Sequence, residues 1–143
     1  MKQHMRMREK IILRVVSRAL IPFILLFGLY VQFHGDFGPG GGFQAGVIFT
    51  AGLVLYGLIF GLEPLKRVAT PRGVEIAMAV GLILYAGTGV ISLFLGERYL
   101  DYDALGHHGQ HYGILLVEAG VGITVTSTIL MIFYAFAGRR EEA

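Results

Sequence analysis

A single carboxylate lies inside a long apolar stretch in the C-terminal part of this sequence. Glu118 is the only charged residue between Tyr112 and Ala137. A charged side chain at the centre of a membrane helix costs about 2.5 to 3.5 kcal/mol on insertion scales, so Glu118 should face protein or water, or be protonated. The default chemistry of such a residue is a proton or cation path, and the alternative is a hydrogen bond to another subunit that fixes assembly. Helical spacing gives it small and hydroxyl-bearing neighbours on the same face: Gly122, Val125, Thr126 and Ile129.

The most unusual stretch is a glycine-rich run from His34 to Gly46, which opens an uncharged segment. No Lys followed by Ser or Thr comes after its last glycine, as a P-loop requires, and no strand precedes it to form a dinucleotide-binding unit. Glycine instead lets irregular backbone reach membrane depth, beside the positive end of the following helix dipole. Two interpretations stay open, a tight turn that lets neighbouring helices approach and an element of an ion path. The candidate site residues of this run are Pro39, Gly40, Gly41, Gly42, Phe43 and Gln44.

Three histidines, His107, His108 and His111, fall within five residues of a glycine-containing loop. Imidazoles bind zinc, copper or nickel, but this spacing is more typical of a polar surface turn, and we predict no metal site and no cofactor. All five histidines lie in loops or in the N-terminal tail, and the chain has no cysteine. No arrangement of nucleophile, base and orienting residue follows from this, and we predict a protein that is not an enzyme.

Four long apolar segments must position these residues. The 143 residues are 55% hydrophobic and 15% charged, with a mean hydropathy of +0.65, which is too apolar for an ordinary soluble domain. The charges fall between the apolar stretches, and a stretch of about 20 residues matches a hydrocarbon core about 30 Å thick. We predict an all-α membrane protein, a single domain over residues 1–143, with four transmembrane helices: 11–33, 43–62, 74–95 and 112–137.

The distribution of Lys and Arg predicts how the chain is oriented in the membrane. Six of the 12 precede Ala19, none lies in the first loop (34–42), three lie in the second (63–73), one in the third (96–111) and two follow Ala137. By the positive-inside rule, both termini and the second loop are cytoplasmic. The basic residues adjoin apolar segments and form no stripe with interleaved aromatics, so we predict contact with the lipid bilayer and none with nucleic acid.

Small residues recur at helical spacing within the predicted segments. Gly57 and Gly61 form a GxxxG pair, Gly120, Thr124 and Thr128 repeat every four residues, and Gly81 and Gly87 lie in the third segment. Such residues let helices approach closely in lipid. With 21 glycines, the chain is expected to pack against other subunits in a larger complex.

The residues also resemble a known family. The run Phe37-Gly-Pro-Gly-Gly-Gly-Phe-Gln-Ala-Gly46 is similar to the hallmark of the B subunit of multisubunit Mrp (Mnh) sodium/proton antiporters. The basic start, Leu62-Glu-Pro-Leu65, and Gly113-Ile-Leu-Leu-Val-Glu-Ala-Gly-Val-Gly-Ile-Thr124 are similar too. One departure is Ala45, where the family often has glycine.

The resemblance implies an accessory subunit in an assembly of several different membrane subunits, which exchanges cytoplasmic sodium for external protons across a bacterial cytoplasmic membrane. It also implies that the run from Pro39 to Gln44, together with Glu118, helps to shape a sodium route or a contact with neighbouring subunits. Two alternatives remain: a structural scaffold, and a subunit of the ion-translocating module of a membrane-bound hydrogenase or respiratory complex. No span contains a lysine, which sets the chain apart from the large antiporter-like subunits that carry a lysine and glutamate relay.

Overall fold

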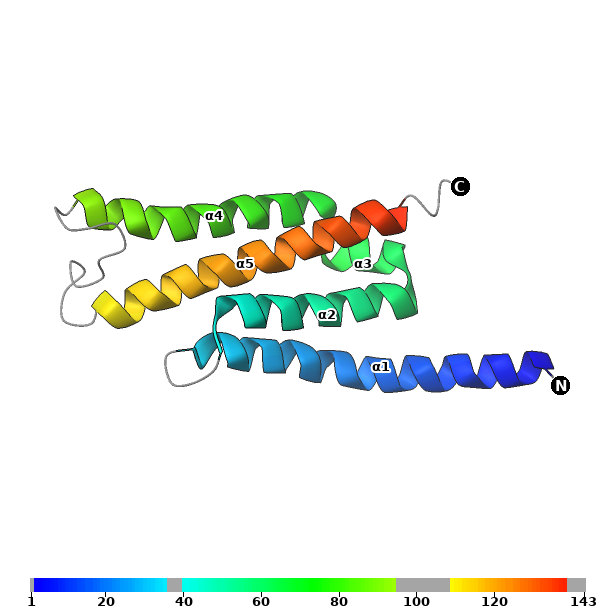
Figure 1. Ribbon diagram of the computed structural model, residues 1–143. Coiled ribbons are helices and arrows are strands. Elements are labelled where there is room, and N and C mark those ends of the chain that lie inside the picture. Colours follow the sequence, from blue (N-terminus) through cyan, green and yellow to red (C-terminus); the bar gives the residue numbers. More distant parts are fainter. Residues whose placement is uncertain (1, 36–39, 95–108, 139–143) are drawn as a thin grey trace.

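The computed structural model describes residues 2–35, 40–94 and 109–138, and these residues are helical apart from short turns. Their elements are α1 (Lys2–Phe33), α2 (Gly42–Phe60), α3 (Leu62–Val68), α4 (Pro71–Phe94) and α5 (Gly109–Gly138). Four long helices run side by side, and the short α3 lies at the end of the bundle where α1 begins and α5 ends (Figure 1).

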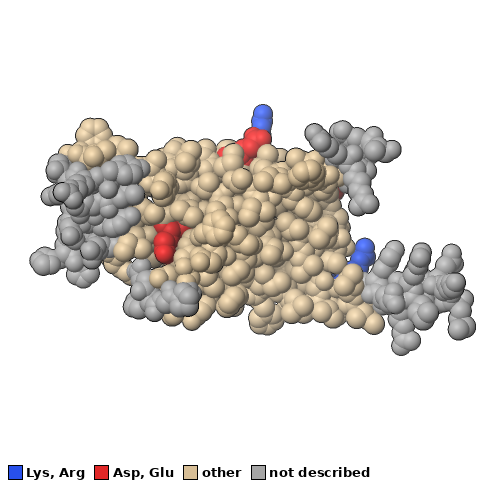
Figure 2. Space-filling view, in the orientation of Figure 1, with Lys and Arg blue, Asp and Glu red and all other residues tan. Residues whose placement is uncertain are grey.

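The four long helices are long and apolar enough to cross a membrane, over Ile11–Phe33, Gly42–Phe60, Pro71–Phe94 and His111–Gly138. Less than a third of each span is buried inside the chain, so most of its surface faces lipid or other proteins. The face in Figure 2 is almost wholly uncharged, as expected of a surface in a bilayer. The predicted all-α membrane fold with four transmembrane helices is confirmed, while the orientation of the termini stays a prediction.

The second loop contains structure that the hydropathy pattern did not predict. The second transmembrane helix ends at Phe60 rather than at residue 62, because Gly61 takes a φ of +103° that favours glycine. Helix α3 follows immediately, so the expectation of a loop from Glu63 onward was wrong. Glu63 lies in the first turn of α3, Lys66 and Arg67 lie in its last turn, and each charge complements the helix dipole there. Because of these charges, the hydropathy pattern of this short helix is the same as that of a polar loop.

The helices pack in the order α1, α2, α5, α4, so the chain contains a row rather than a closed ring (Figure 1). Glycines permit the close contact of α4 with α5, since a Cβ added at Gly81 would lie 2.5 Å from the Thr124 hydroxyl and 2.8 Å from the Gly120 carbonyl oxygen. The two glycines of the predicted GxxxG pair do not share one contact between helices. Gly57 packs against Leu65 and Phe133, whereas Gly61 forms the turn between α2 and α3.

A cluster of apolar side chains holds the end of the bundle at which α3 lies. Its buried members are Leu62, Leu65, Val74, Leu130 and Tyr134. Leu65 is fully buried, and the Tyr134 hydroxyl donates a hydrogen bond of 2.6 Å to the carbonyl oxygen of Ala69, just beyond α3. This cluster seats α3 against the spans.

Candidate functional site

The carboxylate of Glu118 lies against the glycine-rich connection between α1 and α2. A Cβ added at Gly35, just after α1, would lie 2.5 Å from both carboxylate oxygens of Glu118. A Cβ added at Gly41, just before α2, would lie 3.1 Å from one of them. The connection can therefore approach the carboxylate so closely only because these positions lack side chains. The two features singled out in the sequence meet in space.

The main chains of α2 and α5 are also in direct contact at this site. A Cβ added at Gly42, the first residue of α2, would overlap the carbonyl oxygen of Glu118. One turn further, a Cβ added at Gly46 would lie 2.8 Å from the carbonyl oxygen of Gly122. The glycine run thus allows a backbone-to-backbone approach that any larger residue would prevent.

The turn itself is held by hydrogen bonds to the end of α1. The Gly41 N–H donates to the carbonyl oxygen of Val31 at 3.4 Å, and the His34 N–H donates to the same oxygen at 3.3 Å. These bonds satisfy a carbonyl that the last turn of a helix leaves without an intrahelical partner. Gly41 has a φ of +123°, and its own carbonyl oxygen accepts a bond of 3.0 Å from the Ala45 N–H as α2 begins. The hydrogen bonds of Gly41 therefore link the end of α1 to the start of α2.

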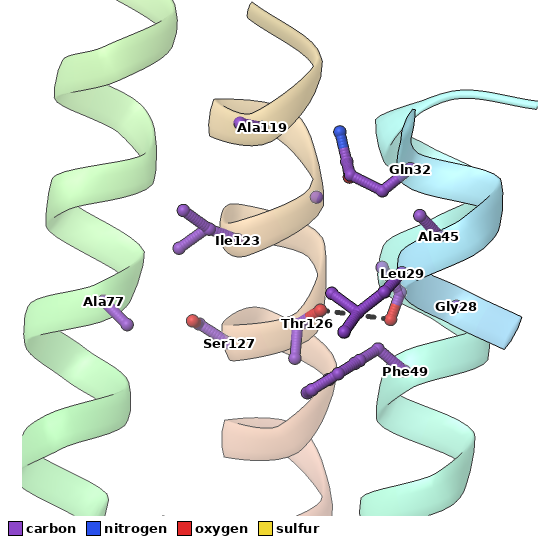
Figure 3. A pocket seen from close by; sticks show the side chains of 12 residues that line it. Gly28, Leu29, Gln32, Ala45, Phe49, Ala77, Ala119, Ile123, Thr126 and Ser127 are labelled. Carbon is purple, nitrogen blue, oxygen red and sulfur yellow. Dashed lines mark hydrogen bonds between the residues drawn. The ribbon is translucent and has the colours of Figure 1, made fainter. Parts of the chain in front are cut away.

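Hydroxyl groups tie α2 to α5 below this turn. The Thr126 hydroxyl of α5 donates to the carbonyl oxygen of Gly46 on α2 at 3.1 Å. The Thr50 hydroxyl donates to the same oxygen within α2 at 2.8 Å, and it also lies 3.4 Å from the carbonyl oxygen of Thr126 on α5. Figure 3 draws the Thr126 bond as a dashed line across the gap between the helices. Thr50 is only 1% exposed. In lipid, such bonds between helices replace those that water would otherwise supply.

The remaining candidate residues of the glycine run are placed around this contact. Gly40 packs against α1, where an added Cβ would lie 3.0 Å from the Val31 carbonyl oxygen. Phe43 is 60% exposed and Gln44 is exposed as well, and both lie in the first turn of α2. Pro39 lies outside the described residues.

The histidine-rich loop is largely outside the described residues too, since His107 and His108 precede α5. His111 lies within the first turns of α5 and is exposed, with its ring 5.9 Å from that of Tyr112.

The arrangement suits a carboxylate that exchanges a proton or a cation. Glu118 lies within the apolar span of α5, yet it is only half-buried. The start of α2, which is the positive end of a helix dipole, lies beside it. Backbone carbonyls beside a carboxylate are the oxygen ligands that alkali cations accept.

Comparison with known proteins adds a second, independent observation. A family model described as a domain related to the MnhB subunit of Na+/H+ antiporter matches residues 12–131. The chain belongs to this MnhB family. Similar proteins of Staphylococcus haemolyticus and Staphylococcus aureus are 32% identical over 137 residues, which cover 92% of this chain and 96% of each relative. Both relatives carry the provisional name antiporter subunit mnhB2.

The MnhB match spans every candidate site residue, from Pro39 to Thr126. Sequence reasoning overlooked some residues that pack around this candidate site. Gly35 faces the carboxylate, and Thr50 supplies the buried hydroxyl. Their signals were present but weak: a glycine next to a helix end, and a hydroxyl one turn after Gly46. Gln32 is a third such residue, an uncharged amide in an apolar segment, and it packs against Gly122.

Proposed function

We propose that this MnhB-family chain is an accessory, multi-pass subunit of a multisubunit Na+/H+ antiporter in a bacterial cytoplasmic membrane. It works beside other membrane subunits, has both termini in the cytoplasm, and is a transporter component rather than an enzyme. Its specific contribution is the contact between Glu118 and the glycine turn, which helps to form the sodium route. The observation that carries this role is the packing of the Glu118 carboxylate against Gly35 and Gly41, in a chain of a family related to an antiporter subunit.

The mechanism is electrostatic. The carboxylate of Glu118 and the carbonyl dipoles around it replace part of the hydration shell of a sodium ion, weakly enough to let the ion leave. Protonation of the same carboxylate competes with sodium, which couples the two ions without any covalent step. Gly40, Gly41 and Gly42 keep the main chain close, Phe43 and Gln44 adjoin them in the first turn of α2, and Thr126 holds α2 against α5. Pro39 belongs to the same proposed set of residues.

The test is Glu118→Gln in the intact complex, because glutamine keeps the size of the side chain and removes the titrating group. Sodium-dependent proton movement is measured in inverted membrane vesicles with a pH-sensitive dye, and subunit content is measured by co-purification. Glu75→Gln on α4 is the matched control, since Glu75 is exposed and lies away from the turn. We expect at least a tenfold loss of transport for Glu118→Gln with normal assembly, and near-normal transport for the control.

A structural scaffold is the second candidate, favoured by the direct backbone contact of Gly42 with Glu118. In that case Glu118→Gln leaves the transport kinetics of the assembled complex unchanged, and this result would contradict a role of Glu118 in the ion path. A place in the ion-translocating module of a hydrogenase or respiratory complex is distinguished by gene neighbours, because an antiporter operon lacks hydrogenase and iron–sulfur genes. The purified chain alone in liposomes should move no sodium in any of these cases.

A further inference from the structure

The row of helices leaves a groove on one face, which adjoins the contact between Glu118 and the glycine turn and shares Gly46, Gly122 and Thr126 with the packing of α2 on α5. It has a volume of about 270 Å³ and is lined by residues of α1, α2, α4 and α5. Figure 3 shows Gln32 and Leu29 of α1 on one side of α5, and Ala77 of α4 on the other. The outer helices of the row therefore form the walls, and α5 with α2 forms the floor.

Half of the residues that line the groove are small, although its floor also contains the large side chains of Phe49 and Ile123. Six of the lining residues are glycine or alanine: Gly28, Ala45, Gly46, Ala77, Ala119 and Gly122. Gly28, Ala45, Gly46 and Gly122 are buried within the chain, whereas Ala77 and Ala119 are partly exposed. Small residues at a surface in lipid allow the backbone of another helix to come close, and such contact drives helix association. This shape alone does not distinguish a helix from a lipid chain.

A polar group within the lining makes that distinction. The side-chain nitrogen of Gln32 is buried and has no hydrogen-bond partner among the residues that the structure describes. Its amide oxygen lies against Gly122, where an added Cβ would be only 2.5 Å away. An amide donor without an acceptor is costly in hydrocarbon, and rotation about the last side-chain bond can turn it toward the groove. A lipid acyl chain has no acceptor to offer.

A second copy of this chain also fits poorly. The outward faces of its two outer helices carry large apolar side chains, such as Phe23 and Phe27 on α1 and Leu82 and Ile83 on α4. These residues are too bulky for close backbone approach to Ala77 and Ala119, and they provide no acceptor for Gln32. The complementary surface is a narrow helix face with small residues and one oxygen acceptor.

We propose that this groove seats a transmembrane helix of a different subunit, which presents small residues to Ala77 and Ala119 and an acceptor oxygen to Gln32. The inference rests on the proposed function, since it requires a second kind of membrane subunit. It goes beyond that function by assigning the face of the chain on which one partner docks and the chemistry of the docking helix.

Photocrosslinking in the intact complex tests the location. Phe49 lines the groove, and its replacement by p-benzoylphenylalanine keeps an aromatic ring at this position and extends it with a photoreactive benzoyl group. Phe27 replaced in the same way is the matched control, because it lies on the other face of α1 beside Gly28, which contacts the main chain of Phe49. The two probes therefore sit at the same depth.

We expect the probe at Phe49 to crosslink to one other subunit at least fivefold more than the probe at Phe27. A product between two copies of this chain, equal labelling from both positions, or an assembled complex with no product from Phe49 would each overturn the groove assignment. If the unmodified chain does not co-purify with other subunits at all, the proposed function fails along with the inference. Co-purification thus distinguishes a failure of the proposed function from a failure of the groove assignment alone.

A pair of substitutions on α4 gives a second readout. Ala77→Leu fills the groove, and Ala79→Leu adds the same side chain at an exposed position two residues away. Because the groove is open, Ala77→Leu should leave the fold of the chain intact. We expect it to reduce recovery of the complex at least threefold, with little change for Ala79→Leu. Equal recovery of the two variants contradicts the proposal.

Discussion

The two ends of the contact between α2 and α5 are held together by different means. At the connection between α1 and α2, Gly42 and Gly46 bring the main chains of α2 and α5 into direct contact. At the other end, where α3 lies, side chains fill the space, and Leu65 and Leu130 are almost completely buried. The first end keeps backbone dipoles and the Glu118 carboxylate close together, whereas the second contains an apolar core.

The two ends therefore have different roles: the α3 end stabilises the fold, and the glycine end places the polar groups. Apolar burial is not directional and tolerates substitutions that conserve volume, so the α3 end can serve as an anchor. Contact between main chains depends on the absence of side chains at a few positions, which makes the glycine end sensitive to any added atom. The polar groups that could handle an ion are all placed by the more sensitive end.

The largest expected effect comes from removing a buried side chain from the apolar core at the α3 end. Leu65→Ala removes a fully buried side chain from the core and should lower the free energy of unfolding by about 2 to 5 kcal/mol. The measurement is reversible unfolding of the purified chain in mixed detergent micelles. Leu58→Ala is the control, since Leu58 is 68% exposed on α2. A similar loss for both variants would mean that the α3 cluster is not a core that stabilises the fold.

Gly42→Ala tests the other end with one added methyl group. Its Cβ would overlap the Glu118 carbonyl oxygen, so α2 and α5 must move apart, at a cost of about 1 to 3 kcal/mol. The matched control is Gly87→Ala on α4, where no atom lies within 4 Å of the added Cβ. Unfolding in detergent gives the cost, and vesicle transport shows whether the shift also disturbs the site. If Gly42→Ala is as stable and active as the control, the backbone contact contributes neither to the stability of the chain nor to transport.

The contrast between the ends also explains how far sequence alone could reach. Hydropathy predicts four spans because lipid demands long apolar helices, and it marks Glu118 and the glycine run because both are unusual in such a setting. Hydropathy does not specify which helix packs beside which. The meeting of Glu118 with Gly35 and Gly41 depends on the helix order α1, α2, α5, α4, and no local pattern contains that order.

Two other features were missed for local reasons. Helix α3 is short, and its charged residues resemble those of a loop, although Leu62 and Leu65 are buried in the core. Gln32 carries no charge, so a single amide near the end of an apolar segment hardly changes the hydropathy pattern. Only its burial against Gly122, without a partner for its nitrogen among the described residues, makes it informative.

The smallest expected effect concerns the hydroxyl tie at the glycine end. Thr126→Val removes one of the two hydroxyl groups that donate to the Gly46 carbonyl oxygen, and the Thr50 hydroxyl remains at 2.8 Å. Because the acceptor keeps a partner, the loss should fall at or below the average of about 0.6 kcal/mol for hydrogen bonds between membrane helices. Thr126→Ser, which keeps the hydroxyl, is the control, and both are measured by unfolding in detergent. A loss above about 2 kcal/mol for Thr126→Val alone would show that hydrogen bonding, rather than close backbone packing, holds this end together.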